Sequence, residues 1–202
     1  MKIDMSRATF VVLCVVSLSG CALLSPVKTD TKQYTLNDIP LDLPSDRTHS
    51  ATLLVLVPET EPLYATTQMA YTTQAYQIAY FSQNEWAATP SQMIEPMIVE
   101  TLRRTHYFSD VLSSPDFGHH TFTLRSEILE IKQDFTSEPA MLQLTMRFNL
   151  SRDAANQVIA TRELSVREPM LERNPYAGVV AANEAMAKLL RELARFVVDN
   201  AN

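Results

Sequence analysis

Residues 142–150 alternate between apolar and polar side chains without a break. The apolar positions are Leu142, Leu144, Met146, Phe148 and Leu150. Because successive side chains of a strand point to opposite faces of a sheet, all five lie on one face. The pattern therefore predicts an antiparallel strand with one face buried in a core and the other in water.

Weaker alternation on both sides extends this strand into a meander. Upstream, Phe122, Leu124 and Ile128 share one parity, but Leu129 and Ile131 change it, which indicates a β-bulge. Downstream, apolar residues alternate again between positions 158 and 166, after a turn at 152–156.

Two segments have helical periodicity. The first opens with Thr-Pro-Ser-Gln at residues 89–92, an N-cap, an N1 proline and a capping-box partner, and is expected to end near Thr105. Within it, Pro96 removes a backbone donor, so the helix either kinks or begins there. The second helix opens at Asn-Pro, residues 174–175, and keeps one apolar face as far as Val197.

Further strands are predicted by short apolar or aromatic runs at 33–36, 52–57, 68–71, 75–81 and 107–112. The expected fold class is α+β, a mainly antiparallel sheet with two helices packed on one face. Residues 51–202 are long enough for one core and are expected to form a single domain. Residues 21–50, which carry prolines among polar residues, are predicted to be a tether with a short edge strand.

The first twenty residues have the organisation of an export signal. Lys2 and Arg7 precede an apolar run from Ala8 to Leu18, which is too short for a permanent membrane span. The run leads into Leu18, Ser19, Gly20 and Cys21. These four residues resemble the bacterial lipobox, where the cysteine thiol is lipidated and the signal is cut before it. Residues 1–20 are therefore predicted to be a lipoprotein signal peptide.

The lipobox makes Cys21 the predicted lipid-attachment site, with acyl chains such as palmitate as the anchor. More than one chain gives a stable membrane attachment. Ala22 stands where an aspartate would retain a lipoprotein in the inner membrane, so the resemblance implies the outer membrane, facing the periplasm. The alternative is an ordinary export signal with a chance cysteine.

Composition argues against several functional classes. The chain has three glycines, and those after the signal, Gly118 and Gly178, are isolated, so neither a P-loop nor a dinucleotide-binding loop can be written. A formal net charge of −6 provides no basic field for nucleic acid. Cys14 leaves with the signal and Cys21 is modified, which removes disulfide, thiol and Cys-metal chemistry. No cofactor is expected.

An enzymatic function is disfavoured. Four histidines follow the signal, His49, His106, His119 and His120. They lie in neither a nucleophile elbow nor a His-Glu-x-x-His helix, and the adjacent pair beside Gly118 is expected in a loop. Glu127 and Glu130 are interpreted as solvated strand positions. We therefore predict no catalytic and no metal-binding residue.

Several short motifs occur in a characteristic order along most of the chain. They are Tyr34-Thr35-Leu36, the strand ending at Pro58, Met69-Ala70-Tyr71, Ile78-Ala79-Tyr80-Phe81, Trp86-Ala87 before Pro90, the helix to Leu102, Phe108-Ser109-Asp110-Val111 and Ala181-Ala182-Asn183. In this order they resemble the ABC-type transport auxiliary lipoprotein component family, which is associated with MCE-type lipid transporters.

The resemblance implies a non-enzymatic auxiliary lipoprotein that bridges an MCE-type ABC transport system to the outer membrane for trafficking of lipid or hydrophobic compounds. Its expected partners are an MCE-domain periplasmic protein and, through acylated Cys21, the outer membrane; the oligomeric state stays open. Tyr71, Tyr80 and Trp86 are candidate partner contacts if they are exposed.

Two other functions remain open at this stage. The domain could bind lipid independently, since the methionines after the signal suit an adaptable apolar surface, although core packing is the simpler interpretation. It could also be an envelope-assembly lipoprotein without any transporter partner.

Overall fold

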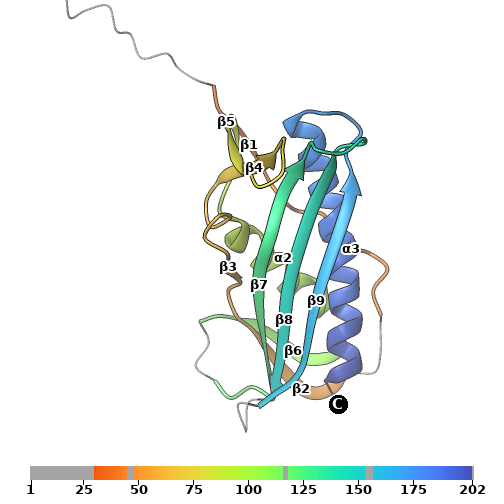
Figure 1. Ribbon diagram of the computed structural model, residues 1–202. Helices are drawn as coiled ribbons and strands as arrows, with labels where there is room; N and C mark the ends of the chain where they lie inside the picture. The colour runs from red at the N-terminus through yellow and green to blue at the C-terminus, as the bar shows by residue number, and fades with distance from the viewer. Residues whose placement is uncertain (1–29, 45–47, 116–117, 153–156, 202) are drawn as a thin grey trace, which may run out of the picture. The chain divides into compact units, whose positions relative to one another are not determined.

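Three long antiparallel strands dominate the fold. The computed structural model describes residues 30–44, 48–115, 118–152 and 157–201. In it β7 (Phe122–Asp134), β8 (Met141–Arg152) and β9 (Gln157–Pro169) pair in sequence order (Figure 1). All five apolar side chains of the alternating run in β8 are buried. The predicted half-buried antiparallel strand and its meander are confirmed.

The predicted β-bulge lies in β7. The pairing of β7 with β8 shifts register between Ile128 and Glu130, where the sequence changes parity. Ile128 and Ile131 are both buried, because the extra residue returns the second side chain to the core face.

The second edge of β7 is shared by three short strands in succession. β2 (His49–Val55) pairs with the start of β7, β3 (Glu59–Thr60) with its middle and β4 (Gln68–Thr72) with its end. All three pairings are parallel. β7 therefore collects segments that are far apart in the sequence.

Three more strands complete the sheet. β5 (Ala79–Trp86) is antiparallel to β4, β1 (Lys32–Tyr34) is parallel to β5, and β6 (Phe108–Ser113) is parallel to β2. The expectation of a mainly antiparallel sheet was wrong, since the nine-stranded sheet is mixed. The physical reason is that alternation reports which face a strand buries, whereas the direction of pairing depends on crossovers that bring distant segments together.

Two helices cover one face of this sheet in the described part of the chain. α2 (Pro90–Arg104) packs on β2 and β6, and α3 (Pro175–Asn200) packs on β8 and β9 (Figure 1). The predicted start of the second helix is confirmed, because Asn174 Oδ1 accepts a hydrogen bond from Ala177 N at 2.8 Å. Both helices turn their apolar faces to the sheet, and the α+β class holds.

Gly178 allows α3 to approach the sheet closely. Gln133 of β7 is 2% exposed, and its Nε2 donates to Pro175 O at 3.1 Å in the first turn of α3. A Cβ atom at position 178 would collide with the Gln133 side-chain amide. The absence of a side chain at position 178 therefore leaves room for Gln133 to reach under the helix.

We predict that Gly178→Ala lowers the free energy of unfolding by about 1–3 kcal/mol, the usual cost of an overpacked core. Alanine is intrinsically the better helix former by about 1 kcal/mol, so the loss must come from the collision. Urea denaturation measures it.

The matched control is the same substitution in a Gln133→Ala background, where the colliding amide is gone. There Gly178→Ala should be neutral or stabilising. Equal losses in both backgrounds would show that the close approach is not the cause.

Candidate partner-binding groove

The start of α2 follows its sequence signals. Gln92 Oε1 accepts from Thr89 N at 3.2 Å and from Thr89 Oγ1 at 3.0 Å, and Pro90 is the first helical residue. The helix continues without interruption through Pro96 and ends at Arg104, so the predicted end near Thr105 is confirmed. Of the two alternatives for Pro96, a start of the helix at this residue is excluded.

Pro96 removes one backbone donor from the middle of α2. Proline has no N–H, so the Gln92 carbonyl lacks the donor that residue 96 would otherwise supply. Pro96 is exposed, and both residues line the same groove on the protein surface. The helix thus presents the exposed ring of Pro96 and the exposed side chain of Gln92 to the groove.

An extended segment, residues 35–44, runs from β1 along the helical layer; we call it the strap. Asn183 of α3 holds its first half. Asn183 Oδ1 accepts from Asn37 N at 2.9 Å and from Asp38 N at 3.3 Å, while its Nδ2 donates to Thr35 O at 3.2 Å. One side chain on the helix therefore makes three hydrogen bonds to the strap backbone.

An ion pair holds the second half of the strap. Arg191 of α3 donates from Nε and Nη2 to Asp42 Oδ1, at 2.9 and 2.7 Å. The hydrogen bonds from Arg191 hold the pKa of the Asp42 carboxyl below its ordinary value. The strap also buries Leu36 and Pro40 against the domain.

The strap changes the extent of the folded domain. The compact unit begins at Thr31, whereas sequence analysis placed a tether over residues 21–50. The part from Thr31 to Pro44 carries β1 and the strap and belongs to the fold. Only the residues before Thr31 are left between Cys21 and the domain.

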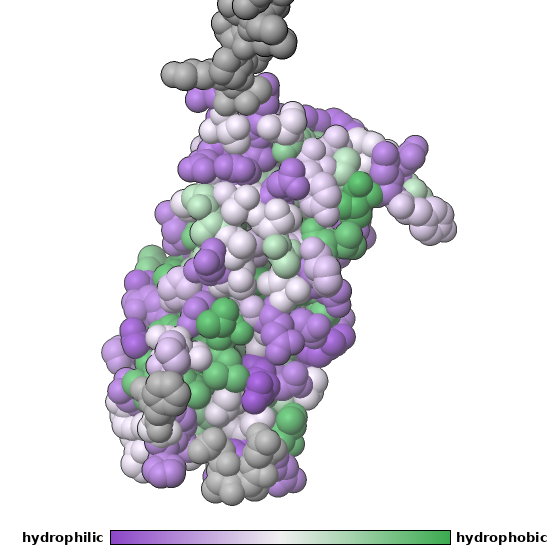
Figure 2. Space-filling view, turned by 90° about the vertical axis from the view of Figure 1, so that its left-hand side faces the viewer, coloured by the Kyte–Doolittle hydropathy of each residue, from purple (hydrophilic) through white to green (hydrophobic). Residues whose placement is uncertain are grey.

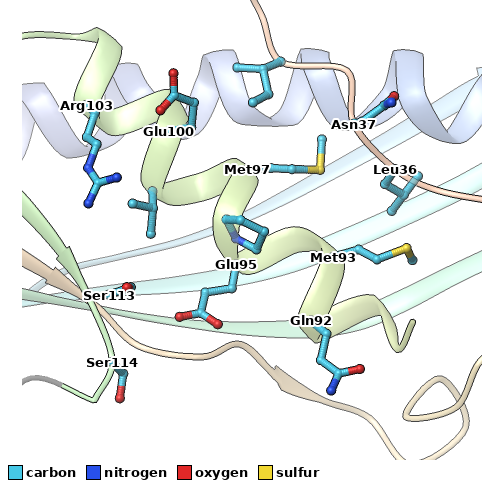
Figure 3. A pocket seen from close by; sticks show the side chains of 13 residues that line it. Leu36, Asn37, Gln92, Met93, Glu95, Met97, Glu100, Arg103, Ser113 and Ser114 are labelled. Atoms are coloured by element: carbon cyan, nitrogen blue, oxygen red, sulfur yellow. The ribbon is translucent and has the colours of Figure 1, made fainter. Parts of the chain in front are cut away.

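A groove lies between the strap and α2 (Figure 3). Its volume is about 810 Å³. The strap contributes Leu36, Asn37 and Ile39, the end of β6 and the next residue contribute Ser113 and Ser114, and α2 contributes the rest of the lining. Arg103 joins two of these elements, because its Nε and Nη2 donate to Val111 O in β6 at 3.0 and 2.8 Å.

The groove has a covered apolar floor and a polar rim. Leu36, Met93 and Met97 are each 8% exposed or less, so little of their apolar surface is open to a ligand. The exposed lining residues are Asn37, Gln92, Pro96, Arg103 and Ser113. A polar rim of this kind suits contact with a segment of another protein better than contact with an acyl chain, which needs an apolar cavity.

Elsewhere, exposed apolar side chains are scattered. On the face drawn in Figure 2, hydrophobic residues form separate patches with hydrophilic residues between them. The large side chains that are most exposed include Leu41, Tyr76, Leu171 and Tyr176.

The three aromatic residues predicted to contact a partner do not form one surface. Trp86 is 3% exposed and belongs to the core. Tyr71 is half-buried and stacks on Phe81 with ring centroids 4.3 Å apart. Tyr80, also half-buried, donates its hydroxyl to Leu63 O at 2.9 Å. Trp86 thus has almost no surface for a partner, and contact through Tyr71 or Tyr80 stays a prediction.

The remaining sequence predictions are placed as follows. The lipobox residues Leu18, Ser19, Gly20 and Cys21 lie outside the described residues. His119 and His120 lie in a loop, as expected. Within the described ranges, no group of three or more His, Cys, Asp or Glu side chains could hold a metal ion. No helix among these residues is long and apolar enough to cross a membrane.

The residues that shape the groove were not predicted from the sequence. Asn183 was noted only as part of a motif, although a polar side chain within the apolar stretch of α3 is a usable signal. Pro96 was noted as a misfit, but its place on the groove depends on a strap whose position no local pattern predicts.

Comparison with protein families gives one match. The family described as ABC-type transport auxiliary lipoprotein component matches residues 34–194. This range contains most of the strands, all of α2, the strap and most of α3. No curated protein matched the chain.

Solved structures share the fold. A Xanthomonas campestris protein of family DUF330 is 14% identical, with a TM-score of 0.75, and the match covers 84% of this chain and 96% of that one. An uncharacterized protein is 15% identical with a TM-score of 0.66, covering 83% and 99%. A hypothetical protein from Chlamydia trachomatis is 12% identical with a TM-score of 0.51, covering 76% and 98%. At these identities the likeness shows the fold alone.

We predict that Asn183→Ala loosens the strap while the sheet stays folded. Amide hydrogen exchange at Asn37 and Asp38 should become about ten- to a hundredfold faster, since each lost hydrogen bond contributes roughly 1 kcal/mol. Asn200→Ala is the control, because Asn200 Nδ2 bonds only to Phe196 O within α3. Unchanged exchange at both strap amides in Asn183→Ala would contradict the assignment.

Proposed function

We propose that this chain, which belongs to the ABC-type transport auxiliary lipoprotein component family, is the outer-membrane component of an MCE-type ABC transport system. In this role it does no chemistry. It holds the periplasmic part of the transporter close to the outer membrane while lipid or another hydrophobic compound moves between the membranes.

The family match carries the proposal. It extends from Tyr34 in β1 into the second half of α3 and so includes every element that lines the groove. The lipobox supports the anchor, because acylation of Cys21 would attach the chain to a membrane. The outer membrane is inferred from Ala22, and the MCE-domain partner from the resemblance of the motifs.

The length of the tether supports a bridging role. Nine residues separate Cys21 from Thr31, where the compact unit begins, and a fully extended chain spans at most about 3.3–3.6 Å for each of the ten steps. Anchored through Cys21, the N-terminal end of β1 stays within about 35 Å of the membrane surface. Such confinement raises the effective concentration of the domain for a partner that approaches the same membrane.

The groove is the proposed contact for the transporter. Its rim carries the exposed side chains of Asn37, Gln92 and Arg103. A polar segment of a periplasmic protein with hydrogen-bond donors and acceptors would satisfy this rim. The ring of Pro96 supplies apolar contact in the middle of it.

Independent lipid binding is the second candidate function. The volume of the groove falls in the range of small-molecule sites, which favours it. The covered floor argues against it, because Met93 and Met97 offer little apolar surface. We therefore rank contact with a transporter protein above lipid binding.

We predict that affinity capture of the full-length lipoprotein from membranes recovers an MCE-domain protein and its transporter subunits. Pro96→Arg should lower this recovery several-fold, because a cationic side chain then fills the groove. The substitution also restores the missing backbone donor, so it does not weaken α2. Mass spectrometry of the captured proteins gives the readout.

Two controls separate the groove from the anchor. Gln83→Arg adds the same charge at an exposed position of β5 outside the groove and should leave recovery unchanged. Cys21→Ala should release the chain from the membrane fraction and reduce recovery. Capture of the wild-type chain without transporter subunits, but with phospholipid that survives washing, would favour the independent lipid-binding function.

A further inference from the structure

β9 is a long strand with an open edge. It has thirteen residues and pairs only with β8 among the described strands. Figure 1 shows it at the right-hand edge of the sheet with no further strand beside it. Most of its side chains are exposed, including those of Arg162, Glu163 and Arg167. Open edges of this length are the places where sheets accept another strand.

The sequence of β9 is complementary to itself when it is read in the opposite direction. In an antiparallel pair with a twofold axis at Ser165, each residue faces the one at the mirrored position of the second strand. Arg162 then faces Glu168, Glu163 faces Arg167 and Leu164 faces Val166. Both charged pairs have opposite signs, and each occurs twice because of the symmetry.

Neighbouring registers lose this match. A twofold axis at Leu164 places Arg162 opposite Val166 and Glu163 opposite Ser165. An axis at Val166 places Leu164 opposite Glu168 and Arg167 opposite Ser165. With the axis at Ser165, Arg162 faces Glu168 and Glu163 faces Arg167. Either shifted axis removes both of these charge pairs, so the charges favour the register centred on Ser165.

The arginines of this edge are available for such pairing. Arg162 and Arg167 are exposed and make no ion pair with any described residue. Their counterparts hold partners inside the monomer: Glu163 binds Arg147 at 3.1 Å and Glu168 binds Lys188. A carboxylate accepts several hydrogen bonds, so the exposed Glu163 can bind a second cation. Glu168 is 6% exposed in the monomer, so the pair of Glu163 with Arg167 is the one that charge reversal tests.

The same register also brings two exposed apolar residues, one from each copy, towards each other. Ile159 lies near the start of β9 and is 36% exposed, whereas Leu171 lies two residues past its end and is 90% exposed. Their positions mirror each other about Ser165. Pairing through β9 therefore brings an apolar side chain of each copy towards one of the other and reduces the exposure of both.

We propose that β9 is a self-association edge, at which a second copy of this chain adds antiparallel to the sheet with the twofold axis at Ser165. The sheet then continues from one copy into the other, and the two α3 helices lie on the same face of it. The surface is separate from the groove between the strap and α2, so the two contacts can form together.

Disulfide trapping tests the register. Directly opposed residues of antiparallel strands have Cα atoms about 4.5–5.5 Å apart, within disulfide range. In the full-length lipoprotein, Ser165→Cys should give a covalent dimer under mild oxidation. Thr145→Cys is the matched control, since Thr145 hydrogen-bonds to Ser165 on the same face but lies one strand away from the edge. The wild-type chain reports any background from unprocessed precursor, which would keep Cys14 and an unmodified Cys21.

Charge reversal tests the complementarity. In the Ser165→Cys background, Arg167→Glu should lower the yield of dimer about tenfold, because glutamates then face each other twice. The swap Glu163→Arg with Arg167→Glu restores opposite charges and should recover the yield.

The proposal is overturned if Ser165→Cys gives no more dimer than Thr145→Cys while circular dichroism and urea denaturation show that both variants are folded. It is also overturned if the swapped variant stays as poor a dimer as Arg167→Glu, since the register would then not depend on these charges.

Discussion

The structure depends on the two-sided pairing of β7. One edge of this strand carries the continuous antiparallel ladder to β8, and the other is divided among β2, β3 and β4. β2, β3 and β4, which all precede α2, thus form hydrogen bonds to the same strand, β7, which comes later in the chain. The cost of closing these long loops is balanced by burial of the helices on a single face. The bulge in β7 keeps both Ile128 and Ile131 on the buried face, which also carries the polar side chains of Ser126 and Gln133.

Local signals in the sequence predicted the parts of the fold that depend on local physics. The alternation of residues 142–150, the parity change near Leu129 and the cap at Thr89 each act within a few residues, and the structure contains the strand, the bulge and the helix start. The direction of the short strands depends on contacts between distant segments. Thr52 to Val57 indicates a buried strand, but nothing within it shows that both of its neighbours would be parallel to it.

The groove was harder to predict than the fold. Tryptophan is a residue type that is common in protein interfaces, but Trp86 is buried in the core. Sequence does not separate the two cases, because large aromatic side chains stabilise both cores and interfaces. Asn183 is a polar residue within the apolar stretch of α3, but its role depends on its hydrogen bonds to the strap, which no local pattern predicts. The pattern at residues 18–21 is local and needs no tertiary information, so membrane attachment through Cys21 could be predicted from sequence and stays a prediction. The shape of the groove depends on contacts between distant segments and could not be predicted.

The strap also determines how the protein responds to mechanical load. A pull applied to the chain before Thr31 would enter the fold at β1, which is held to β5 over three residues, and would then reach the bonds of Asn183 and Arg191. The long ladders of β7, β8 and β9 lie outside this path. Release of residues 31–44 would remove β1 from the sheet but leave the other strands paired, and it would add roughly 45 Å of extended chain, at about 3.3 Å per residue. The strap is thus a length of chain that load could release while the long ladders of β7, β8 and β9 stay paired.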